Sequence, residues 1–259
     1  MKSRIRTKTY ICGNYKHIFF YPVFSTSSRR KKRYKPTTLV QAEINSRRAE
    51  KRLEMLLETN FDEKDCFFTA TYRSDLRPKT DEKAMKQARN FIRRIQYQCK
   101  RKGLDAPVAV WCTELSKDNK LYHHHFVIKS GLNYDELAKI WGKGRTSGGK
   151  LHFDVDGMSG LAKYLPKEPI GAVRYHSTKN LKQPLEQQND NTSIKEFNKI
   201  FEQAFFHLNN ELAEKYPEYN INDNSLTAYE SFVGCRFVYI KLCKKRGKTD
   251  GIRRTKSPV

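Results

Sequence analysis

Three consecutive histidines begin an apolar, β-forming stretch, Tyr122–Ile128 (YHHHFVI), and this stretch limits the possible folds more than any other. In a β-strand, successive side chains point to opposite faces. His123 and His125 are therefore expected on one face of a sheet and His124 on the other. Two imidazoles two residues apart on one face can bind one metal ion. The alternative is a surface strand that carries three solvated histidines.

A second apolar strand precedes the histidine strand. The pattern predicts strands over Val108–Leu115 and Leu121–Ile128, joined by the polar segment Ser116–Lys120. Two strands with so short a polar connection are typical of an antiparallel β-hairpin. The hairpin brings the side chains of the first strand next to the histidines.

The register of this hairpin decides whether a carboxylate joins the histidines. If Leu115 pairs with Tyr122, Glu114 lies opposite His123 and on the same face as His125. These three residues would form a two-histidine, one-carboxylate metal site with open positions. This register requires a loop with an even number of residues, or a bulge, and an odd loop turns Glu114 away. In that case the next candidates for the third ligand are His152, Asp154 and Asp156.

The donor set indicates a divalent ion. Imidazoles favour transition metals, whereas a carboxylate and water ligands suit magnesium or manganese, so we expect Mn²⁺ or Mg²⁺. Cys112 would lie opposite His125 and would be a softer ligand that favours zinc. The alternative is that Cys112 is a core cysteine.

A candidate nucleophile follows in the segment Gly160–Lys167 (GLAKYLPK). On a helix, Tyr164 and Lys167 share a face, and a tyrosine near a bound metal and a cation can act as a covalent nucleophile. Pro166 is expected to kink or end that helix. The alternatives are Lys163 for the cation and Tyr175 for the nucleophile.

The charge balance indicates a polyanionic partner. The chain of 259 residues has 51 Lys and Arg against 28 Asp and Glu, a net charge of +23. Basic runs occur at residues 29–33 and 244–246, and such runs bind phosphates without reading sequence.

Compartment and cofactor class follow from patterns that the sequence lacks. We find no apolar run of about 18 residues and no signal peptide. The six cysteines show no Cys-x-x-Cys pair, which argues against a zinc finger and a disulfide framework. We therefore expect reduced thiols, a cytoplasmic location and no membrane partner. A phosphate-binding Gly-x-x-x-x-Gly-Lys-Ser/Thr motif is also lacking, so no nucleotide cofactor or attached helicase domain is expected.

The predicted elements give an α+β fold. From residue 65 to Tyr164 their order is β-α-β-β-α-β-α, with the third strand of this part followed by a glycine-rich basic loop (142–150) and a strand over 150–155. This order predicts a central antiparallel sheet of about five strands with helices packed on one side.

The chain is expected to divide into four parts. Residues 1–36 form a basic N-terminal arm, and residues 37–170 form the main domain, which includes a helix over 38–58. Residues 171–243 form a C-terminal helical and β extension packed on that domain, with a helix from residue 193 to about residue 216. Residues 244–259 form a basic disordered tail.

Three blocks in this order resemble a known family: Phe68–Tyr72, His123–Ile128 and Tyr164–Lys167. The sequence resembles the HUH endonuclease superfamily, in particular the single-tyrosine rolling-circle replication initiators of phages, plasmids and integrative elements. Residues 11–15, 21–24 and 59–61 also resemble that group, and the likeness covers about residues 10–170. His124 and Pro166 depart from the family pattern.

The resemblance implies an HUH/ferredoxin-like sheet and a metal-dependent DNA nicking and joining activity. The tyrosine would become linked to a five-prime phosphate, leaving a three-prime hydroxyl that primes rolling-circle replication. It maps the metal ligands onto His123, His125 and Glu114, the nucleophile onto Tyr164 and its accompanying lysine onto Lys167. The basic residues expected to hold DNA are Arg73, Lys143, Arg145, Lys150 and Lys163.

The implied partners are single-stranded or hairpin origin DNA and a host helicase, in the cytoplasm of a bacterial host. Two other functions stay open from the sequence. One is a non-catalytic, basic nucleic-acid-binding protein on the same fold, which would explain the charge. The other keeps the chemistry in an HUH transposase or a conjugative relaxase.

Overall fold

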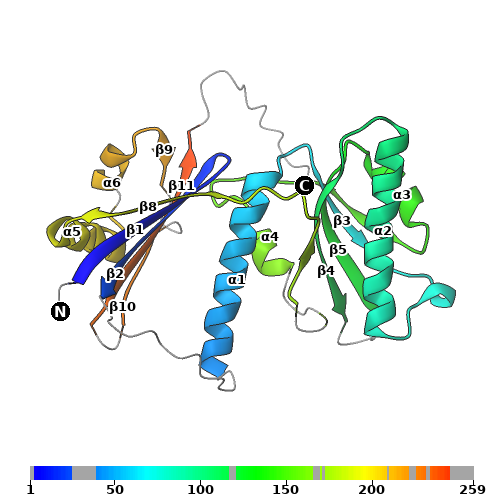
Figure 1. Cartoon of the computed structure of the whole chain (residues 1–259), viewed down its shortest axis with the longest axis horizontal. Helices are drawn as coiled ribbons and strands as arrows, with labels where there is room; N and C mark the ends of the chain where they lie inside the picture. The colour runs from blue at the N-terminus through cyan, green and yellow to red at the C-terminus, as the bar shows by residue number, and fades with distance from the viewer. Residues whose placement is uncertain are drawn as a thin grey trace, which may run out of the picture. The chain divides into compact units, whose positions relative to one another are not determined.

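The computed structural model describes residues 3–24, 39–116, 121–165, 170, 173–208, 210–221, 226–231 and 234–245. The chain forms two compact units (Figure 1). Unit 1 combines Met1–Ser27 with Glu186–Val259, and unit 2 is Ser28–Leu185. No described helix combines the length and the apolar composition that a membrane span requires.

Unit 2 is built on a five-stranded antiparallel sheet. Its elements are α1 (Leu39–Asn60), β3 (Cys66–Ala70), the 3-10 helix η1 (Ser74–Leu76), α2 (Asp81–Arg101), β4 (Val108–Leu115), β5 (Tyr122–Lys129), α3 (Tyr134–Trp141), β6 (Thr146–Lys150), α4 (Ser159–Tyr164) and β7 (His176–Ser177). The strand order is β6-β3-β5-β4-β7. The predicted α+β class, the antiparallel five-stranded sheet and the order β-α-β-β-α-β-α from β3 to α4 are confirmed.

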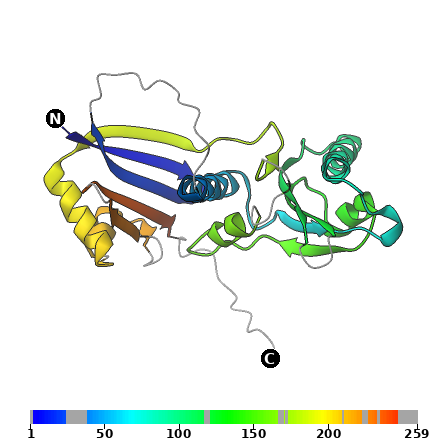
Figure 2. The same ribbon diagram turned by 90° about the horizontal axis from the view of Figure 1, so that it is seen from below.

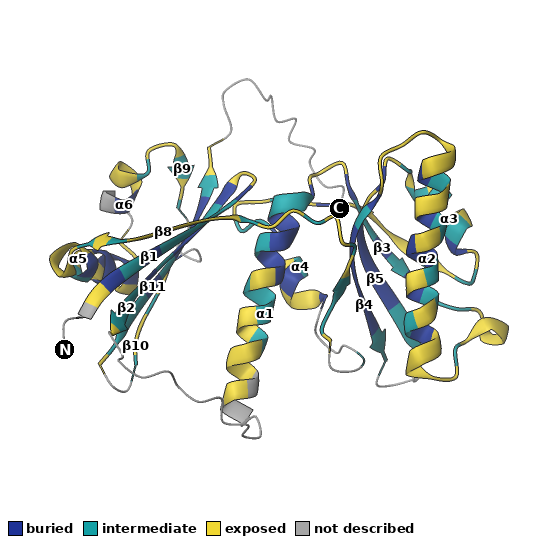
Figure 3. Cartoon of the chain, viewed as in Figure 1, coloured by how far each residue is buried: buried dark blue, intermediate teal, exposed yellow. Residues whose placement is uncertain are grey.

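Helices cover both faces of this sheet, so the expectation of helices on one side is wrong. Side chains of α2 and α3 pack on one face around Phe68 and Phe126, and side chains of α1 and α4 pack on the other around Val110 and Val127 (Figures 1 and 2). Phe126 and Val127 are adjacent on β5 and both are fully buried. A strand that is apolar on both faces requires cover on both, and the helices show their buried sides toward the sheet (Figure 3).

Local signals in unit 2 fix the helix ends. Thr80 caps α2 by accepting a hydrogen bond from the backbone N–H of Lys83 at 3.3 Å. Asn133 and Glu136 form a reciprocal capping box at the start of α3. Gly103 follows α2 with a φ of +67°, as expected for a glycine that ends a helix.

The glycine-rich basic loop is an edge strand instead. The expected strand over 150–155 is placed too late, because β6 covers Thr146–Lys150 and pairs with β3. Gly148 has a φ of +144°, and a Cβ atom there would overlap the carbonyl oxygen of Phe67. Glycine therefore lets the two backbones approach closely enough to pair, which a loop signal alone does not reveal.

Unit 1 is built on a second sheet. Its elements are β1 (Ser3–Cys12), β2 (Tyr15–Phe24), β8 (Leu185–Thr192), α5 (Ile194–Phe205), α6 (Asn210–Lys215), β9 (Tyr219–Asn220), β10 (Leu226–Glu230) and β11 (Arg236–Lys244). The order is β10-β11-β2-β1-β8, and β9 also pairs with β11. Phe197, Ile200 and Phe201 of α5 pack on one face of this sheet against residues that include Ile18 and Ile240.

Three sequence expectations change in unit 1. Residues 3–24 are not an irregular arm but two paired ten-residue strands, because Ile5, Ile18 and Phe20 alternate with polar residues and bury one face. The helix expected to run to residue 216 ends at Phe205, and His207 has a φ of +53° between α5 and α6. The basic run at 29–33 and most of the C-terminal tail lie outside the described residues.

Candidate active site

The hairpin of β4 and β5 has the register that brings Glu114 to the histidines. Leu115 pairs with Tyr122, Glu114 with His123 and Cys112 with His125. The backbone N–H of Ser116 donates to the carbonyl oxygen of Leu121 at 2.9 Å. Residues 116–121 separate the paired strand ends, which is an even number, so Glu114, His123 and His125 share one face of the sheet.

The polar atoms of these three side chains are arranged as a cation site requires. His125 Nε2 lies 3.4 Å from Glu114 Oε2, and the side chains of these residues are 5% and 18% exposed. Glu114 Oε1 and His123 Nε2 are buried and have no hydrogen-bond partner among the described residues. Buried polar atoms nearly always have a partner. Two unpartnered ligand atoms beside a third ligand fit a bound divalent cation.

A threonine orients one of the imidazoles. Thr69, on β3 beside β5, pairs with His125, and its Oγ1 lies 3.0 Å from His125 Nδ1. This contact leaves Nε2, the nitrogen nearest Glu114, as the ligand atom. Such a second hydrogen bond holds a metal-binding imidazole in one tautomer and orientation.

Burial keeps the neighbouring imidazole His123 in the form that binds metals. Its pKa is lowered by burial and then by the proximity of His125, against the opposing effect of Glu114. A neutral imidazole has a free lone pair for a metal ion. The strand therefore favours the ligand form of this residue.

The middle histidine belongs to the core on the other face. His124 is fully buried, and its Nε2 and Nδ1 lie 2.6 Å from Tyr72 Oη and 2.9 Å from Thr113 Oγ1. Burial, followed by the effect of His125 and His123, lowers its pKa to about 3. His124 is thus a neutral, fully hydrogen-bonded core residue, which explains how a polar side chain is accommodated where the family pattern has an apolar one.

Tyr164 is the last residue of α4 and lies against the ligand face. Its ring centroid is 5.1 Å from that of His125 and 6.2 Å from that of Phe67. The side chain is 47% exposed. Burial raises the pKa of Tyr164, and the charges of Glu114 and Cys112 raise it further. The phenol is therefore close to the candidate ligands and also accessible to solvent.

The helix that carries Tyr164 ends as the proline suggests. Leu165 is the C-cap of α4, directly before Pro166. Lys167 lies outside the described residues, so its expected role stays a prediction. Lys163, the alternative cation, is exposed on α4.

The alternative site residues have other surroundings. Tyr175 packs against the apolar cluster of α1 and α4, and burial raises its pKa while Arg52 opposes the shift. Cys112 is buried in the same cluster, and burial raises its pKa, which favours a core thiol over a thiolate ligand. All six cysteines are free thiols. Because Glu114 faces the histidines, the condition that required His152, Asp154 or Asp156 as third ligand does not arise.

The structure brings three of the five expected DNA-binding residues together. The N–H of Arg73 donates to the carbonyl oxygen of Lys143, and the N–H of Thr71 donates to that of Arg145, each at 2.9 Å. These bonds continue the β3–β6 pairing beyond Ala70, which pairs with His124. Arg73, Lys143 and Arg145 therefore lie at the end of the sheet where the histidines begin.

Lys150 lies at the opposite end of the same sheet. It pairs with Cys66, which in turn pairs with Ile128 at the far end of β5 from the histidines. The sequence grouped Lys150 with Lys143 and Arg145 because all three fall in one short segment. The extended β6 strand separates them.

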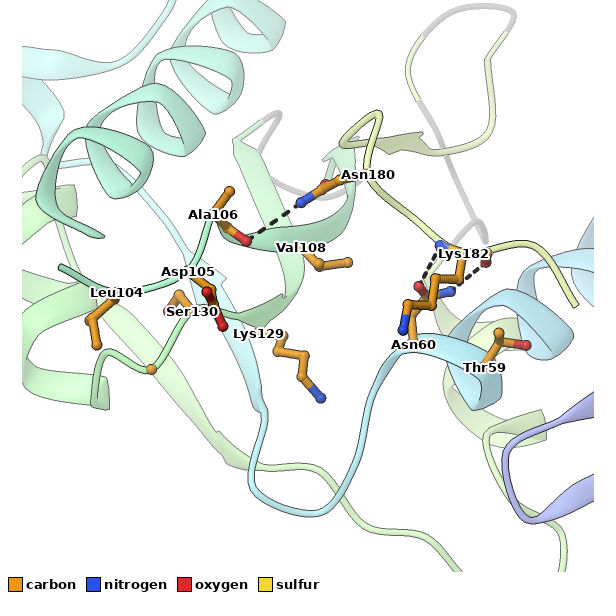
Figure 4. Close-up of a pocket in the computed structure, with 11 residues that line it drawn as sticks. Thr59, Asn60, Leu104, Asp105, Ala106, Val108, Lys129, Ser130, Asn180 and Lys182 are labelled. Carbon is orange, nitrogen blue, oxygen red and sulfur yellow. Dashed lines mark hydrogen bonds between the residues drawn. The ribbon is translucent and has the colours of Figure 1, made fainter. Parts of the chain in front are cut away.

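A pocket of about 450 Å³ lies elsewhere in unit 2 (Figure 4). Its lining includes Val108 and Lys129, which pair where β4 begins and β5 ends, and Asn60, whose side chain bonds the backbone of Lys182. Val108 is six residues before Glu114 on an extended strand, or about 20 Å. The pocket is separate from the candidate ligand face.

Two parts of the arrangement are not predicted from the sequence. Thr69 was placed on a strand but not on the histidine face, because strand pairing determines which residue it meets. The partners of His124, Tyr72 and Thr113, come from two different strands. Their hydroxyl groups next to a buried histidine would be a signal only once the register is known.

Comparison with known proteins places the same segment in a replication context. Residues 65–169 match the model of a family described as replication-associated protein ORF2. The matched range runs from just before β3 past α4 and contains Glu114, His123, His125 and Tyr164. No curated protein and no solved structure shows significant similarity to the chain. The match supports a family of replication initiators, and with it DNA binding and DNA replication, for this part of the chain.

Proposed function

We propose that the chain is a metal-dependent nickase of the HUH type that cuts and rejoins single-stranded DNA to initiate rolling-circle replication of a phage, plasmid or other mobile element. The observation that carries the proposal is the ligand face. Glu114, His123 and His125 share it, two of their ligand atoms are buried without partners among the described residues, and the ring of Tyr164 lies against His125.

In the proposed reaction, Tyr164 is the nucleophile. Its phenol oxygen attacks the phosphorus of the scissile phosphodiester and the bond to the three-prime oxygen breaks. The products are a five-prime phosphotyrosine and a three-prime hydroxyl, and the phenol proton leaves to solvent, to which Tyr164 is open. Attack of a three-prime hydroxyl on the phosphotyrosine reverses these bond changes and rejoins the strand.

The other residues hold and orient. Glu114, His123 and His125 would bind Mn²⁺ or Mg²⁺, which when bound polarises the scissile phosphate. Thr69 orients His125. Arg73, Lys143 and Arg145 would hold DNA phosphates at the histidine end of the sheet, with Lys163 and Lys167 nearer the tyrosine in sequence.

The test is a nicking assay with labelled single-stranded origin DNA, including hairpin forms, and Mn²⁺ or Mg²⁺. The wild type is expected to form a covalent adduct that Tyr164→Phe abolishes and the matched control Tyr175→Phe keeps. His123→Ala and His125→Ala are expected to remove cleavage while DNA binding is retained. An adduct that persists in Tyr164→Phe would refute the assigned nucleophile.

The second candidate, a basic binding protein without catalysis, explains the net charge of +23 but not the unpartnered ligand atoms. DNA binding without cleavage on every origin candidate and with both metals would favour it. A transposase or relaxase would cleave by the same chemistry, so only the DNA that is cut and the fate of the three-prime end would distinguish it.

A further inference from the structure

One face of the six-stranded sheet of unit 1 is lined by aromatic rings. In the β1–β2 register, Ile5, Ile18 and Phe20 point to the face that α5 covers. The alternate residues point to the other face. The rings on this second face, called here the aromatic face, are Tyr10, Phe19, Tyr21, Tyr229, Phe237 and Tyr239.

Contacts between these rings confirm that they share a face across four strands. The ring centroids of Phe19 and Tyr239 are 4.9 Å apart, and those of Tyr10 and Phe19 are 5.9 Å apart. Tyr229 and Phe237 stack at 4.9 Å. Tyr229 is 54% exposed. The rings thus form a contiguous surface rather than scattered positions.

A row of basic side chains runs along β1 on the same face. Arg4, Arg6 and Lys8 alternate with the buried Ile5 and Thr7. In the register, Arg6 lies opposite Tyr21 and Lys8 lies opposite Phe19. Each base is therefore next to the aromatic surface.

Carboxylates of β8 hold these bases. Arg6 Nε and Nη2 donate to the two carboxylate oxygens of Asp190 at 2.8 and 3.0 Å, and Arg4 Nε lies 3.1 Å from Asp190. Lys8 Nζ donates to Glu186 at 2.6 Å. All these groups are partly or fully exposed, and such ion pairs contribute little to stability. Phosphate oxygens can replace the carboxylates as partners of the same donors.

We propose that the aromatic face binds single-stranded DNA, with bases stacked on the tyrosine and phenylalanine rings and phosphates paired with Arg4, Arg6 and Lys8. Aromatic side chains interleaved with bases on a sheet surface are the usual platform for unpaired nucleic acid. The choice of DNA as the strand rests on the proposed function. The net charge of +23 favours a polyanion over a protein partner.

The first test measures affinity of the full chain for a fluorescent oligothymidine without divalent metal. Tyr21→Ala and Tyr229→Ala are each expected to weaken binding about fivefold or more, the lower end of what one stacked base contributes. The matched control is Tyr97→Ala, an exposed tyrosine (61%) beside Arg101 on α2 of unit 2. It is expected to bind as the wild type does. Unfolding curves verify that each variant is folded.

The second test removes a competitor of the DNA phosphates and leaves the aromatic face intact. Asp190→Asn releases Arg4 and Arg6, so binding is expected to tighten. The slope of log affinity against log salt should steepen by about 0.7 for each additional phosphate that the released arginines bind. Because this variant increases binding, a loss of folding cannot mimic the expected result.

The proposal is overturned if Tyr21→Ala, Tyr229→Ala and Asp190→Asn all bind DNA as the wild type does. Unchanged DNA affinity with a changed oligomeric state in the tyrosine variants would overturn it in favour of a protein interface. Neither test depends on cleavage, and Tyr164→Phe is expected to bind the oligothymidine normally. Failure of the nicking proposal therefore leaves these measurements interpretable.

Discussion

Adjacent histidines on β5 are expected to separate stability from catalysis. His124→Ala removes a fully buried ring whose two nitrogens contact Tyr72 and Thr113. Truncating a large buried side chain to alanine destabilises by about 2–5 kcal/mol. Each buried hydroxyl left without a partner adds about 1 kcal/mol. We expect a total loss of about 3–5 kcal/mol, a large share of the about 5–15 kcal/mol typical of a domain.

His123→Ala is the matched variant one position away. His123 is only partly buried, and its Nε2 has no partner among the described residues. Its removal breaks no hydrogen bond at that atom, so the expected loss in the absence of metal is below about 1 kcal/mol. Cleavage should show the reverse order. His123→Ala is expected to be inactive, and His124→Ala is expected to cut DNA at a temperature where it is folded.

Urea unfolding with a chelator present measures the two losses. Tryptophan fluorescence reports on unit 2 because both tryptophans, Trp111 and Trp141, lie there, and the ring of Trp141 is 5.5 Å from that of His124. A loss for His124→Ala below about 1 kcal/mol, or an equal loss for His123→Ala, would refute the assignment of the two residues to opposite faces.

Three other predictions follow from single contacts. Thr69→Val is expected to weaken Mn²⁺ binding to the chain, measured by calorimetry, by about tenfold or more, whereas Thr69→Ser keeps the hydroxyl beside His125 and should bind normally; equal losses in both would contradict the orienting role. Gly148→Ala is expected to destabilise unit 2 by about 2 kcal/mol or more, because its Cβ would overlap the backbone of β3, whereas Gly149→Ala has open space and should be nearly neutral in the same urea assay. Burial, then Arg89, lowers the pKa of His176 below its ordinary 6.5, so the folded state binds fewer protons than the unfolded chain and stability falls as the pH drops below about 6.5; His176→Gln should reduce the loss between about pH 7 and about pH 5, and an unchanged loss would refute this.

Periodicity predicted the parts of unit 2 that depend on local pattern. The alternation along β5 separates His124 from His123 and His125, and Thr80 and Asn133 mark helix starts that the structure has. The position of Glu114 was conditional, because the parity of a polar loop does not follow from its composition. The backbone of β4 and β5 resolves it in favour of Glu114.

Pairing between distant segments was not predictable in the same way. β2 pairs with β11, more than 200 residues later in the chain. The basic side chains of β1 made that strand resemble a solvated arm, although they occupy only one of its two faces. Likewise, glycines in β6 resemble a loop until the close approach of β3 shows why they are required.

The most direct test of the central claim is to identify the residue that becomes linked to DNA. Wild-type protein would be incubated with single-stranded origin DNA and Mn²⁺, digested with nuclease and protease, and analysed by mass spectrometry. We predict a nucleotide attached through a five-prime phosphate to Tyr164, and to no residue when His125 is replaced by alanine. Attachment to Tyr175, or an adduct that forms equally in His125→Ala, would contradict the proposed site.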